Sequence, residues 1–179
     1  MSLVTKMNTQ ESALQHKTIV KKNEDLIPAF DMLLKEGHTV TFVVKGYSMR
    51  PFLEHLRDEA KLESPAGKKI KCGDVVLAEV LPRTYVLHRV ESIVDGIFTL
   101  RGDGNVYGRE QCREGDIIAI ATEFYRKGRK RPDKTTGLKW RAYSALWPSS
   151  SLLRRIILGL QRRLWIPLFR KKDNNTSSK

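Results

Sequence analysis

The sequence predicts a mainly β fold with a minor helical part (α+β), in which one helix leads and a basic helix follows near the C-terminus. Three observations predict it. Short β-branched runs separated by turn residues succeed one another from residue 38 to residue 125. Apolar residues repeat at helical spacing just before them. Beyond residue 125, 16 Lys and Arg residues accompany only two acidic ones.

Residues 1–22 are polar and aperiodic, and we expect a flexible arm without the apolar segment of a signal peptide. A helix is predicted over 26–36. Pro28 suits its first turn and Gly37 can cap its end.

The predicted strands lie in a single stretch that ends near residue 125. They are HTVTFVVK (38–45), EAKLE (59–63), DVVLAEV (74–80), TYVLHRVESIV (84–94), IFTLRG (97–102) and DIIAIATEFY (116–125). Asp95-Gly96 predicts a hairpin between the fourth and the fifth, so we expect a mostly antiparallel sheet.

Charge divides the chain in two. Residues 1–125 carry a net charge of −1 and residues 126–179 carry +14. We therefore predict a β domain over 23–128 and a basic tail over 129–179.

Ser48 lies in VKGYSMRPFL (44–53), where a β-like run ends between turn-forming glycine and proline. A serine there either satisfies turn backbone or acts as a nucleophile. His88 lies between Val86 and Val90 on one face of a predicted strand. It is either a core histidine bonded to a backbone group or a general base for a serine hydroxyl.

Asp103 lies in the Gly-Asp-Gly turn of TLRGDGN (99–105). Its carboxylate could orient an imidazole or form an Asx-turn with its own backbone. Because a Gly-Asp-Gly turn is common, this segment taken alone favours the structural interpretation.

Together these segments resemble the signal peptidase and SOS-repressor superfamily of serine peptidases. The resemblance covers residues 38–128 and rests on the order of G-x-S-M-x-P (46–51), GDVV (73–76), HRV (88–90) and RGDGN (101–105). It implies a curled, barrel-like antiparallel sheet of the signal peptidase–LexA type. It also implies Ser48 as nucleophile, the Ser48 backbone N–H as oxyanion donor, and a base at His88, as in the histidine version found in the endoplasmic reticulum.

The sequence leaves open which carboxylate, if any, orients His88. Asp103 matches a motif position and is our first choice, Glu110 is the alternative, and a Ser–His dyad is the third possibility. Gly46 lacks the hydroxyl that some signal peptidases use as a second oxyanion donor.

The expected function is therefore hydrolysis of a peptide bond in a peptide or protein precursor, such as leader removal. The alternative is a catalytically inactive peptide-binding module of the same fold. No cofactor or metal is expected. Two cysteines, too few for a disulfide scaffold, fit a cytoplasmic location.

The sequence of the tail predicts an amphipathic helix over residues 151–169. Leu153, Ile156, Ile157, Leu160 and Leu164 fall within one arc of a helical wheel. The residues expected to face a membrane are Arg154, Arg155, Arg162, Arg163 and Trp165. Such a helix suits peripheral attachment to an anionic membrane at its inner face, the alternative being a helix docked on the β domain. Nucleic acid is not favoured as a partner, because no base-reading or stacking pattern accompanies the charge.

Overall fold

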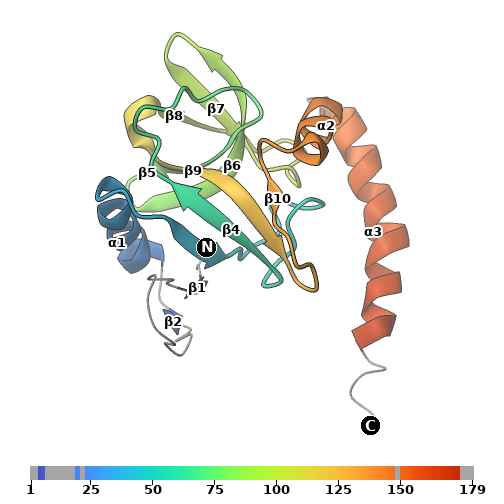
Figure 1. The fold of residues 1–179 in the computed structure, drawn as a ribbon. Coiled ribbons are helices and arrows are strands. Elements are labelled where there is room, and N and C mark those ends of the chain that lie inside the picture. The colour runs from blue at the N-terminus through green and yellow to red at the C-terminus, as the bar shows by residue number, and fades with distance from the viewer. Residues whose placement is uncertain (1–3, 7–18, 21–22, 148–149, 174–179) are drawn as a thin grey trace.

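The computed structural model describes residues 4–6, 19–20, 23–147 and 150–173 (Figure 1). Its helices are α1 (Asn23–Lys35), α2 (Leu138–Leu146) and α3 (Ser151–Asp173), with a 3-10 turn, η1, at Glu114–Asp116. Its strands are β1 (Val4–Lys6), β2 (Ile19–Val20), β3 (Val40–Val43), β4 (Asp58–Glu63), β5 (Val75–Leu81), β6 (Thr84–Val94), β7 (Ile97–Arg101), β8 (Glu110–Arg113), β9 (Ile117–Arg126) and β10 (Asp133–Lys134).

The strands form one antiparallel sheet in the order β2-β1-β3-β4-β9-β5-β6-β7-β8, with β10 added beside β9. The prediction of a mainly β fold is confirmed. The sheet is not closed, because β2 and β8 end the order without pairing with each other. Two short strands, β1 and β2, lie within the segment predicted to be a loose arm, and β1 pairs with β3.

Alternating polarity explains how the central strands are buried. In β4, Asp58, Ala60 and Leu62 are buried while the residues between them are partly exposed. The middle of β6 differs, since Leu87 to Val90 are buried without a break. Because both faces of this part of β6 are covered, its polar side chains need hydrogen-bond partners within the protein.

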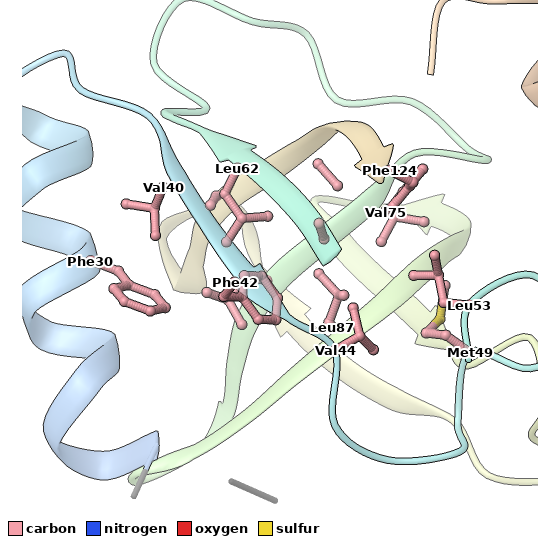
Figure 2. Close-up of a cluster of buried hydrophobic side chains, with 14 of the residues drawn as sticks. Phe30, Val40, Phe42, Val44, Met49, Leu53, Leu62, Val75, Leu87 and Phe124 are labelled. Atoms are coloured by element: carbon pink, nitrogen blue, oxygen red, sulfur yellow. The ribbon is translucent and has the colours of Figure 1, made fainter. Parts of the chain in front are cut away.

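One large core lies between α1 and the sheet. Figure 2 shows Phe30 of α1 beside Phe42 of β3, with Met49 and Leu53 at the other end of the same cluster. The ring centroids of Phe30 and Phe42 are 6.2 Å apart. Met49 follows Ser48 directly, so burial of its side chain fixes the turn that carries the serine.

The basic tail is not a separate unit. Trp140 of α2 is 3% exposed and belongs to this core, with its ring 4.6 Å from that of Phe52 and 4.9 Å from that of Phe124. The predicted division between residues 128 and 129 is therefore a boundary of charge and not of packing.

α3 begins where the sequence predicts and continues to Asp173. Figure 1 shows it on the opposite side of the molecule from α1. The prediction that Arg154 faces a membrane is wrong, because its side chain is turned into the protein and is only 2% exposed. Arg155 and Arg163 are exposed. The side chains of Arg162 and Trp165 lie outside the described residues.

Candidate functional site

Ser48 lies on the turn that follows β3. Gly46 begins this turn with φ at 116°, a conformation that a residue with a side chain rarely adopts. Its N–H donates a hydrogen bond to Nδ1 of His55 at 2.8 Å. The backbone requirement at residue 46 therefore explains why a hydroxyl-bearing residue is absent there, and Ser48 itself remains partly accessible.

His88 lies in the doubly buried part of β6 and is 3% exposed. Its Nδ1 is 2.9 Å from Oε2 of Glu110, the first residue of β8. A neutral imidazole that donates its Nδ1 proton to this carboxylate presents Nε2 as an acceptor. The contact therefore selects the tautomer that a general base requires.

The segment 101–105 brings His88 and Ser48 to the same place. The N–H of Gly104 donates to the carbonyl oxygen of Ser48 at 2.7 Å. At Gly102, a side-chain carbon would overlap this same oxygen and would lie 3.0 Å from Nε2 of His88. At Gly104, it would lie 2.6 Å from the carbonyl oxygen of Tyr47. Both glycines are thus needed for close approach of two turns.

Asp103 lies between these glycines but does not contact His88. Its two carboxylate oxygens each accept a hydrogen bond from the Arg89 guanidinium at 2.8 Å, and Oδ2 also accepts one from the Tyr143 hydroxyl at 3.0 Å. Burial, and then the charge of Asp103, raise the pKa of the Tyr143 phenol, which keeps it a neutral donor. The structure pairs His88 with Glu110, and Asp103 holds the turn in place.

Arginines complete the support of this turn. Arg101, fully buried, donates to the carbonyl oxygens of Asn105 (3.1 Å) and Val106, and pairs with Glu91 at 2.7 Å. Arg154 of α3 donates to the carbonyl oxygen of Gly102 at 2.9 Å. Burial, and then the nearby charge of Arg101, lower the pKa of the Arg154 guanidinium.

Among the described residues, neither the hydroxyl nor the backbone N–H of Ser48 takes part in a hydrogen bond. Nε2 of His88 is likewise without a hydrogen bond within this part of the chain. Catalytic hydrogen bonds are often long in a structure without substrate and tighten when substrate binds. The Ser48 hydroxyl, the Ser48 N–H and Nε2 of His88 are therefore all unpaired within the described chain, and the turn at residues 102–104 lies against both Ser48 and His88.

Two cavities open on the surface of the protein. A cavity between α1 and the loop after β4 is lined by residues such as Ile27, Ser64 and Ile118. A second cavity, beside α2, is lined by Gly73, Arg89 and Ser144. Neither of these cavities includes Ser48 or His88.

Four supporting residues were not predicted from the sequence: Arg89, Arg101, Tyr143 and Arg154. Arg89 adjoins His88 in the HRV segment, which was the only signal for it. Tyr143 and Arg154 lie in the segment interpreted as a tail, and no local pattern connects them with residue 103.

Replacing Gly102 with Ala should impair the site, because the added carbon displaces the Ser48 carbonyl and crowds His88. We expect a loss of stability of about 1–3 kcal/mol, and a loss of any Ser48-dependent activity of about 10²-fold. Thermal unfolding and activity of the variant measure both. Gly115→Ala is the matched control, since a carbon added there meets nothing within 4 Å. Equal behaviour of the two variants would contradict the close approach.

No protein-family model, curated protein sequence or solved structure matches this chain.

Proposed function

We propose that the protein is a serine peptidase of the signal peptidase and SOS-repressor superfamily that cleaves a peptide or protein precursor in the cytoplasm. Ser48 is the nucleophile, His88 the general base, and Glu110 the carboxylate that orients the base. The observation that carries the proposal is the 2.9 Å contact between Nδ1 of His88 and Oε2 of Glu110, because it leaves Nε2 as an acceptor close to Gly102, whose turn is bonded to the carbonyl oxygen of Ser48.

The proposed reaction assigns each of these groups a step. Nε2 of His88 takes the proton from the Ser48 hydroxyl as its oxygen attacks the carbonyl carbon of the peptide bond. Negative charge develops on the carbonyl oxygen, where the Ser48 N–H can donate a hydrogen bond. The C–N bond then breaks, and the leaving amine takes the proton from Nε2. Water, activated by the same nitrogen, hydrolyses the resulting ester and restores Ser48.

Glu110 contributes through the histidine. When Nε2 gains a proton the ring becomes a cation, and the carboxylate at Nδ1 stabilises it. The Glu110 side chain is 29% exposed, so water weakens this effect relative to that of a buried carboxylate.

The test is to expose the full chain to a proteome-derived peptide mixture and identify new peptide termini by mass spectrometry. We expect the wild-type protein to generate a set of termini sharing residues around the cut, and Ser48→Ala to generate none of them. Ser64→Ala is the control, because its hydroxyl only accepts a hydrogen bond from the N–H of Ala66. Cleavage that persists in Ser48→Ala would overturn the proposal. The absence of any Ser48-dependent termini would overturn it as well. If the protein then bound peptides without cutting them, the result would support the inactive peptide-binding module.

A further inference from the structure

One side of α3 contacts the segment 101–105, the turn that is bonded to Ser48. Arg154 donates to the carbonyl oxygen of Gly102 at 2.9 Å, and the hydroxyl of Ser151, one turn earlier, accepts from Arg101 at 3.1 Å. Because residues three apart lie on the same side of a helix, these two contacts fix which side of α3 faces the β domain.

The apolar stripe of α3 points elsewhere. Leu153, Ile156, Ile157 and Leu160 have spacings of three, one and three residues, which place them along one side of a helix. Their side chains are 51%, 51%, 38% and 54% exposed, respectively. No element of the described chain therefore covers this stripe, although contiguous exposed apolar surface is rare on proteins without a partner for it.

The charge around the stripe indicates what the partner is. α3 contains seven basic residues and one acidic residue; Arg155 and Arg163 are both exposed, and Arg163 adjoins the stripe on the helix surface. A second copy of this chain carries the same net charge of +13 and would be repelled. A nucleic acid satisfies the charge but leaves the isoleucines and leucines exposed to water. An anionic lipid surface satisfies both, since acyl chains cover the stripe and headgroups pair with the arginines.

We propose that α3 lies in the surface of an anionic bilayer through Leu153, Ile156, Ile157 and Leu160, as a peripheral attachment. Within the described part of the chain, no helix is long and apolar enough to cross a membrane. Arg154, adjacent to Leu153, binds the turn that touches Ser48 and His88, so the docked helix holds this site beside the lipid surface. Docking does not rest on the proposed peptidase activity.

The experiment is flotation of the full chain with vesicles of phosphatidylcholine alone, or of phosphatidylcholine mixed with phosphatidylglycerol. We expect binding to the anionic vesicles that weakens, without vanishing, in high salt. The variant Ile156→Ser/Leu160→Ser should bind about 10- to 100-fold more weakly, because it removes two apolar anchors. The matched control is Leu81→Ser/Val94→Ser, which alters side chains 66% and 62% exposed elsewhere on the surface.

A second variant, Arg155→Glu/Arg163→Glu, tests the charge without touching the stripe. It should lose the preference for anionic over neutral vesicles, and circular dichroism shows whether each variant stays folded. Wild-type protein that ignores anionic vesicles would overturn the proposal, as would stripe and control variants that bind equally. A dimer that the stripe variant dissociates would also overturn it, because a second copy would then be the partner. None of these readouts involves cleavage, so failure here and failure of the peptidase proposal are distinguishable.

Discussion

A His88→Gln variant is expected to lose Ser48-dependent peptide cleavage by at least about 10⁴-fold while keeping its fold. Glutamine is polar and has a similar length, but its amide cannot accept the proton of the serine hydroxyl. Turnover of a peptide identified with the wild-type protein measures the effect. His38→Gln is the control, since that side chain is 63% exposed and lies apart from the site.

Two carboxylate variants separate the roles of Glu110 and Asp103. Glu110→Gln should reduce the rate constant for cleavage by about 10²-fold or more with little effect on stability, because the imidazolium loses its counter-charge. Asp103→Asn should destabilise the protein and affect the rate only as far as the turn shifts. Equal activity of Glu110→Gln and wild type would leave a Ser–His dyad, and a larger rate effect at Asp103 would contradict the pairing of His88 with Glu110.

An Arg89→Met variant is expected to lower the free energy of unfolding by about 3–5 kcal/mol. Arg89 is 5% exposed and Asp103 is fully buried, so the substitution leaves a carboxylate out of water without its cation. The Tyr143 hydroxyl remains as a donor but does not neutralise the charge. Arg89 also lies over the Trp140 ring, 4.4 Å from its centroid, so some packing is lost as well.

Urea unfolding followed by circular dichroism measures this loss. Lys35→Met is the matched control, because the Lys35–Asp31 pair is exposed at the lysine, with 73% of the side chain accessible, and should contribute no more than about 0.5 kcal/mol. The double variant Arg89→Met/Asp103→Leu should recover part of the stability by removing the orphaned charge. A cost below about 1 kcal/mol for Arg89→Met would show that water reaches Asp103.

Most of the sheet could be predicted from the sequence, because its longer strands combine β-branched residues with turn signals at both ends. β8 could not, since Glu-Gln-Cys-Arg has no β-branched residue and forms a strand only by pairing with β7. β10 has two charged residues and depends on β9 in the same way. That the sheet is open could also not be predicted from the sequence, because strand order is set by contacts between distant segments.

For the candidate site, the order of the segments predicts Ser48 and His88 as its residues, but it does not predict which carboxylate contacts His88. Asp103 has the better motif position, yet the pairing of β7 with β8 sets Glu110 opposite Leu100 and within reach of the ring. Arg154 shows the opposite difficulty. Its place in a predicted amphipathic helix suggested a lipid-facing residue, whereas its guanidinium donates to the carbonyl oxygens of Gly102 and Asp103 and lies over the Trp147 ring.

The position of Arg154 decides how far the chain can be shortened from its C-terminus. A cut at the charge boundary near residue 128 removes Trp140, and Phe52 and Phe124 then lose the ring that covers them. A cut at residue 150 keeps this core but removes the guanidinium bonded to Gly102. The smallest unit that retains both therefore includes α3 at least as far as Arg154. Fluorescent labels or other added sequences are therefore best attached C-terminal to that part of α3.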